Sequence, residues 1–77
     1  MEPFTQALEV IAQVMHDGVA THPDNDWVRR SVEYHLACAE RQLRLLRDGD
    51  QQDHLSHAAT RLLMALALRE LDRDGYG

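Results

Sequence analysis

The sequence predicts an all-α fold, a three-helix antiparallel bundle completed by dimerisation. Apolar residues recur at three- and four-residue spacing in three segments, as on the buried faces of amphipathic helices. Aromatic residues make up only 5% of the chain, so the core must be built from Leu, Val, Ala and Met. We expect one domain over residues 1–77, with helices at about 5–17, 29–47 and 54–72.

The size of the chain favours association. At 77 residues and 8.8 kDa, one small core supplies only a few kcal/mol of net stability. A homo-oligomer, a dimer or larger, is therefore expected.

Composition excludes several classes of partner. The chain has 8 basic and 13 acidic residues, a formal charge of −5, and each basic residue is Arg. An acidic chain is not attracted to a nucleic-acid backbone, so we expect no such binding. No apolar run reaches the length of a membrane span and no leader is visible, so we expect no membrane partner and a cytoplasmic location. The lone Cys38 fits a reducing compartment and is interpreted as a packing residue.

The first helix is predicted to begin after Thr5, as an N-cap, and to end at Asp17 and Gly18. Its apolar stripe has helical spacing and consists of Ala7, Leu8, Ile11, Val14 and Met15.

A loop follows over residues 19–27 and contains the turn-forming residues Pro23, Asp24 and Asn25. Long loops in small domains often carry function, which makes His22, Asp24 and Asp26 candidate ligands or substrate contacts. Trp27 either stacks on a base or covers the core, and we favour the packing role.

The second helix has a heptad-like seam of Val32, Leu36, Ala39, Leu43 and Leu46. Glu33 and Glu40 lie about 10 Å apart along its axis, too far to bind one metal ion without another helix. They are either functional carboxylates or members of an exposed face that pairs Glu40 with Arg44.

The third helix holds the densest group of reactive side chains. After the tight turn at residues 48–50, His54, His57 and Arg61 fall on one stripe at i, i+3 and i+7. Two imidazoles and a guanidinium suit a metal or an anionic group, and the alternative is that both histidines are ordinary first-turn residues in water. The following segment, residues 62–68, is apolar on nearly every side, so a second subunit is expected to cover it.

Three sequence islands resemble a known family. They are residues 14–18 with the loop that closes on Trp27, the pair Glu40 and Arg41, and His54-Leu55-Ser56-His57-Ala58-Ala59 running into the Leu-rich helix. On the basis of these islands, the chain resembles the small phage-encoded dATP/dGTP diphosphohydrolase family, and the likeness covers residues 8 to about 70. That family is similar to the MazG-like all-α nucleotide pyrophosphohydrolases.

The resemblance implies hydrolysis of deoxynucleoside triphosphates to monophosphate and pyrophosphate with Mg²⁺ or Mn²⁺. It implies three groups of site residues. The metal ligands would be Glu33, Glu40, Asp53 and His54. The catalytic residues would be Glu40, His57 and Arg61. The substrate-binding residues would be His22, Asp24, Asn25, Trp27 and Arg41.

The chain also departs from that family. Thr21 stands where a basic residue is common, Gln42 stands where histidine is common, and the paired Glu-x-x-Glu and Glu-x-x-Asp pattern of the MazG-like enzymes is absent. Two hypotheses follow: an enzyme or enzyme remnant that handles deoxynucleoside triphosphates, which we favour, and a non-catalytic small acidic phage protein that binds a host protein.

Overall fold

The structure is a computed structural model that describes residues 2–21 and 26–72. Its regular elements in these ranges are four helices, α1 (Pro3–Thr21), α2 (Asp26–Arg29), α3 (Val32–Arg47) and α4 (His54–Leu71), and no strand. The all-α prediction is therefore confirmed for the described part of the chain. None of the described helices combines the length and the apolar character that a membrane span requires.

Helix α1 extends beyond the predicted range at both ends. Pro3 takes the first helical position, where a residue without an N–H group is tolerated. The carboxylate of Glu2 accepts hydrogen bonds from the backbone N–H groups of Phe4 and Thr5, each at 2.8 Å, so Glu2 provides the cap that was expected from Thr5. Gly18 continues the helix instead of ending it.

The second predicted helix, at about 29–47, corresponds to α3 but starts later, and the preceding residues, most of them predicted as loop, form the short helix α2. Ser31 between them is extended, with φ −77° and ψ 161°, and its hydroxyl accepts a hydrogen bond from the Tyr34 backbone N–H at 3.0 Å. A serine in this conformation is a favoured N-cap, so α3 begins at Val32.

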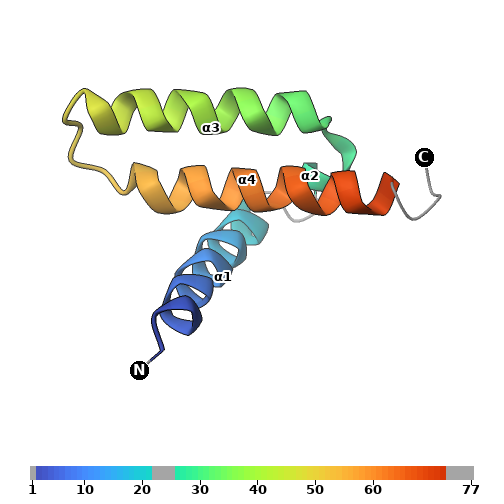
Figure 1. Ribbon diagram of the computed structural model, residues 1–77, viewed down its shortest axis with the longest axis horizontal. Coiled ribbons are helices and arrows are strands. Elements are labelled where there is room, and N and C mark those ends of the chain that lie inside the picture. The colour runs from blue at the N-terminus through green and yellow to red at the C-terminus, as the bar shows by residue number, and fades with distance from the viewer. Residues whose placement is uncertain (1, 22–25, 73–77) are drawn as a thin grey trace.

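Helices α3 and α4 form an antiparallel pair (Figure 1), as the short connection between them predicts. Gly49, at φ +85°, adopts the left-handed conformation that ends α3. The backbone N–H groups of residues 48–50 close this end by bonding to carbonyls of the last turn of α3.

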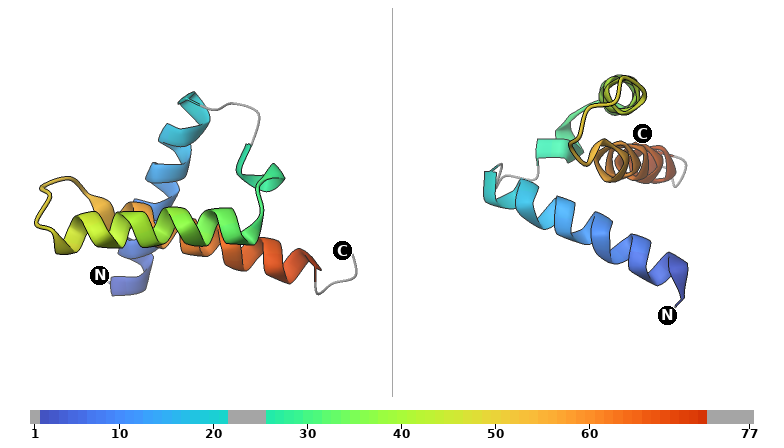
Figure 2. Two further views of the ribbon diagram at one scale, coloured as in Figure 1. Left: turned by 90° about the horizontal axis from the view of Figure 1, so that it is seen from above. Right: turned by 90° about the vertical axis from the view of Figure 1, so that its left-hand side faces the viewer.

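Helix α1 crosses this pair rather than lying along it. Among the described residues α1 contacts α4 but not α3. Its N-terminal half stands away from the pair (Figure 2). The three helices therefore do not pack mutually as the predicted bundle requires.

The core is small and partly polar. The buried apolar residues among those described are Ala39, Ala58 and Ala65, and the largest fully buried side chain is His35. The alanines let α3 and α4 approach closely, while most large apolar side chains remain partly or largely exposed.

Candidate functional site

His35 lies at the centre of the contact between α2, α3 and α4. Its ring is fully buried, with Nε2 2.8 Å from the Trp27 carbonyl oxygen and Nδ1 3.2 Å from an Arg61 guanidinium nitrogen. A carbonyl only accepts a hydrogen bond and a guanidinium only donates one. The imidazole is therefore neutral with its proton on Nε2, so that it donates to Trp27 and accepts from Arg61.

Two aromatic rings surround this imidazole edge to face. The ring centroids of Trp27 and Tyr34 lie 6.4 Å and 5.5 Å from that of His35, at interplanar angles of 62° and 78°. The guanidinium carbons of Arg30 and Arg61 lie 5.0 Å and 5.6 Å from the Tyr34 ring centroid, within the range of cation–π attraction. We call Trp27, Arg30, Tyr34, His35 and Arg61 the His35 cluster.

The His35 cluster combines groups that suit an aromatic anion. Arg61 is half-buried and held by His35, and its planar guanidinium matches the geometry of phosphate oxygens. The Tyr34 side of the cluster is accessible, because Tyr34 is 40% exposed. Chemically, the arrangement can bind an anionic group at Arg61, beside the partly exposed Tyr34.

His54 has a different environment. It is buried, and Nδ1 lies 2.6 Å from Gln42 Oε1. Nε2 lies 2.9 Å from Asp50 Oδ1, although this contact is not aligned as a hydrogen bond. The pKa of Asp50 is lowered by the Gln52 backbone N–H and, after it, by His54. His54 thus joins α3, the turn and α4.

Asp53, predicted to bind metal, is the N-cap of α4. Its carboxylate accepts a hydrogen bond from the Ser56 backbone N–H at 3.4 Å. Hydrogen bonds from the Ser56 hydroxyl and backbone N–H lower the pKa of Asp53, and the nearby His57 and His54 lower it further. His57 itself is exposed, so it shares neither the buried environment of His54 nor that of Arg61 in the His35 cluster.

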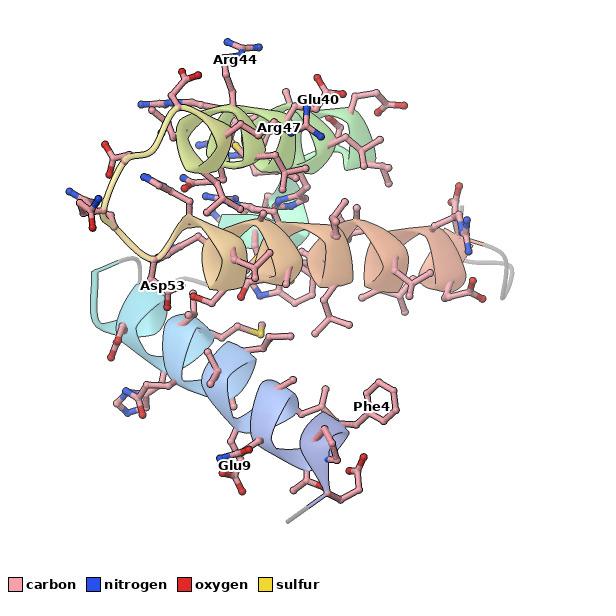
Figure 3. All side chains as sticks on the ribbon, turned by 60° about the vertical axis from the view of Figure 1, so that its left-hand side comes forward. Phe4, Glu9, Glu40, Arg44, Arg47 and Asp53 are labelled. Atoms are coloured by element: carbon pink, nitrogen blue, oxygen red, sulfur yellow. The ribbon has the colours of Figure 1, made fainter. Side chains whose placement is uncertain are left out.

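The predicted acidic ligands of α3 face away from α4. Glu33 and Glu40 are exposed, and Figure 3 shows Glu40 on the side of α3 remote from α4. The face of α3 toward α4 carries His35 and Ala39, and a step of one residue turns Glu40 about 100° from it. Glu33 lies in the first turn of α3, where the helix dipole stabilises a carboxylate. Arg41 is also exposed.

The predicted site residues therefore lie in separate groups and do not form one binding site within the described residues. Among residues 2–21 and 26–72, no three His, Cys, Asp or Glu side chains lie close enough together to hold a metal ion. The predicted metal ligands Glu33, Glu40, Asp53 and His54 are therefore not gathered at one point in the described part of the chain. Of the predicted catalytic residues, Arg61 alone joins the His35 cluster. His22, Asp24 and Asn25 lie outside the described residues.

Sequence reasoning missed Tyr34 and His35. A signal for His35 was present, because it lies three residues after Val32 and four before Ala39, which places it on the buried face of the same helix. The interpretation of Trp27 as a packing residue agrees with its half-buried ring against His35.

Comparison with known proteins gives one family. The family model described as dATP/dGTP diphosphohydrolase, N-terminal, matches residues 3–75, a range that includes the whole His35 cluster. No curated protein and no solved structure matches the chain. The match covers nearly the full sequence, and the chain therefore belongs to the family of dATP/dGTP diphosphohydrolase N-terminal regions.

Proposed function

We propose that this chain binds purine deoxynucleoside triphosphates and takes part in their hydrolysis to monophosphate and pyrophosphate. Family membership supports the class of reaction. The observation that supports the location is the Arg61 guanidinium, which the buried imidazole of His35 holds over the ring of the partly exposed Tyr34.

Arg61 is the proposed phosphate contact. One of its N–H groups donates to His35 Nδ1, which leaves donors for a second partner. A half-buried guanidinium binds an anion more strongly than one in water, because solvent screens it less. His35 also fixes the side chain, so less conformational entropy is lost when phosphate binds.

Tyr34 and Trp27 are the proposed base contacts. Tyr34 is 40% exposed, whereas Trp27 is half-buried against His35. A purine offers a wide π-face, and stacking on an aromatic ring contributes about 1–3 kcal/mol per base. His22, Asp24 and Asn25 precede α2 in the sequence and are retained as proposed sugar or base contacts.

The divalent metal remains a proposal without assigned ligands. Glu33 and Glu40 lie on the outer side of α3, Asp53 caps α4 and His54 is enclosed by Gln42 and Asp50. No step is therefore assigned to Mg²⁺ or Mn²⁺ in one chain. A requirement for metal is tested by the assay itself.

The experiment compares pyrophosphate release and nucleotide binding in three proteins. Wild-type chain is incubated with each deoxynucleoside triphosphate, with and without Mn²⁺, and affinity is measured by calorimetry. We expect dATP and dGTP to bind and to release pyrophosphate. Arg61→Gln should weaken binding about tenfold or more, because one charged hydrogen bond contributes about 1.5–3 kcal/mol.

Arg69→Gln is the matched control. Arg69 is another arginine of α4, exposed and paired with its neighbour Glu70 at 3.2 Å, and it lies outside the His35 cluster. Its substitution should leave affinity unchanged. Equal losses in both variants would show that Arg61 acts only through general charge, and an absence of binding by the wild-type chain would refute the proposal.

A second candidate function is a non-catalytic acidic interaction protein that binds a host protein. The separation of the metal-ligating side chains within the described ranges and the net charge of −5 favour it. It predicts a host complex that survives substitution of both His54 and His57, with no pyrophosphate release from any nucleotide.

A further inference from the structure

Helix α4 presents an uncovered leucine stripe, formed by Leu55, Leu62 and Leu66. These side chains are 61%, 45% and 46% exposed. Their spacing of seven and four residues puts them on one face of the helix, roughly 70° around from the face that carries the buried Ala58 and Ala65. The stripe therefore lies beside the buried face and remains largely uncovered within the chain.

Helix α1 carries a matching stripe that the chain covers only at one end. Phe4 and Leu8 are 78% and 58% exposed, whereas Ile11 and Met15, which continue the same stripe, are half-buried. Figure 3 shows Phe4 at the end of α1 that lies farthest from α3 and α4. The exposed end of α1 is thus an amphipathic half-helix without an intrachain partner among the described residues.

The accessible surface area of the chain also indicates that surface is left uncovered. A folded monomer of this mass has an accessible surface of about 4,800 Å² by the usual scaling. The chain has 6048 Å². The surplus of roughly 1,200 Å² exceeds the 600–1,000 Å² that each partner of a standard stable interface buries.

The two stripes are complementary to each other. Phe4, Leu8, Ile11 and Met15 repeat at steps of four, three and four residues, and so do Leu55, Ala59, Leu62 and Leu66. Such seams pack helix against helix. The charges of the two helices are also of opposite sign. Helix α1 has acidic residues and no Lys or Arg, whereas α4 has Arg61 and Arg69 against one acidic residue, Glu70.

We propose that a second copy of this chain occupies this surface, with the N-terminal half of α1 of each copy lying on the leucine stripe of the other. A contact of this kind is reciprocal, so two copies close into a symmetric dimer and leave no further site open. The stabilisation that the alanine core does not supply then comes from apolar area buried between copies.

Sedimentation velocity of the full chain, without nucleotide, tests the proposal over a wide range of protein concentrations. Wild type should sediment at twice the 8.8 kDa of one chain. The double variants Leu62→Gln/Leu66→Gln and Phe4→Gln/Leu8→Gln should each shift the dimer to monomer at concentrations where wild type is dimeric. The melting temperature of wild type should rise with protein concentration, a readout that needs no variant to fold.

The control is Val28→Gln/Leu36→Gln, which replaces apolar side chains of similar exposure, 47% and 39%, outside both stripes. It should remain dimeric. A wild-type chain of 8.8 kDa with a concentration-independent melting temperature would overturn the proposal and assign the surface to another partner. A dimer that survives either stripe variant would overturn the assigned contact.

Discussion

His35 determines how the small core is connected. A fully buried imidazole is destabilising unless both ring nitrogens have partners. Here the Trp27 carbonyl and the Arg61 guanidinium satisfy them, at 2.8 Å and 3.2 Å. One residue of α3 thus holds α2 and α4 in place, and it orients the arginine that we propose as the phosphate contact.

Replacement of His35 by leucine tests this role. The variant keeps much of the side-chain volume but removes the hydrogen bonds that the buried imidazole makes to the Trp27 carbonyl and to the Arg61 guanidinium, so the free energy of unfolding should fall by about 1–3 kcal/mol. Urea unfolding at one fixed protein concentration measures the change. His16→Leu is the control, because the His16 side chain is 79% exposed, and it should change stability by less than about 0.5 kcal/mol. Equal effects of the two substitutions would contradict a structural role for His35.

Single residues also show which features of the site could not be predicted from the sequence. Arg61 was expected to contact an anion, and it lies in the His35 cluster. Glu40 and His57 were expected to act in one catalytic site, but Glu40 faces away from α4 and His57 is exposed. Residue spacing fixes which side chains share a face of one helix, but it does not fix which face turns toward the neighbouring helix.

The starts of three helices depend on side-chain caps. Glu2, Ser31 and Asp53 each accept a hydrogen bond from a backbone N–H of the first turn that follows. Two of these caps are carboxylates. Hydrogen bonds from the backbone N–H of Phe4, and then from Thr5, lower the pKa of Glu2, as those from Ser56 lower that of Asp53.

These caps predict a direction for the pH dependence of stability. Each carboxylate has a lower pKa folded than unfolded, so its contribution is complete above the ordinary values of 4.5 for Glu and 3.8 for Asp. The contribution is lost as the pH falls through the lowered folded pKa. Thermal melts should therefore show little change from these groups near neutral pH and a fall in melting temperature below about pH 4.

Asp53→Asn separates this effect from general acid unfolding. Asparagine caps a helix about as well as aspartate but does not titrate, so the acid-induced loss of stability should be shallower in the variant. Glu9→Gln, at an exposed position within α1, is the control and should leave the slope as in wild type. A slope unchanged by Asp53→Asn would mean that this cap contributes nothing to the acid sensitivity.

Helical periodicity predicted the long helices and the turn that ends α3, because these depend on local spacing and on one glycine at positive φ. It did not predict the break at Ser31, where a side-chain cap competes with continuation of the helix. It gave the buried face of α3 only in part. Ala39 of the expected seam is buried, but Leu36 and Leu46 of the same seam are each 39% exposed, and the buried His35 was not in the seam.

The molecule as a whole is open for its length. The Cα radius of gyration is 13.3 Å, compared with about 11.5 Å expected for a compact domain of this length. The crossing of α1 over α4 separates the exposed end of α1 from the rest of the fold (Figures 1 and 2). The apolar segment of residues 62–68 predicted uncovered apolar surface. The angle between α1 and α4, however, depends on tertiary contacts that residue spacing does not encode.

We propose that the nucleotide binds at the His35 cluster, and NMR spectra of the ¹⁵N-labelled chain, titrated with a non-hydrolysable dGTP analogue, test this location. The largest shifts should occur at the Trp27 indole and at the backbone amides of Tyr34 and Arg61, and Arg61→Gln should weaken them. Shifts centred on Glu40 and Arg44 of the outer side of α3, or no shifts at saturating nucleotide, would contradict it.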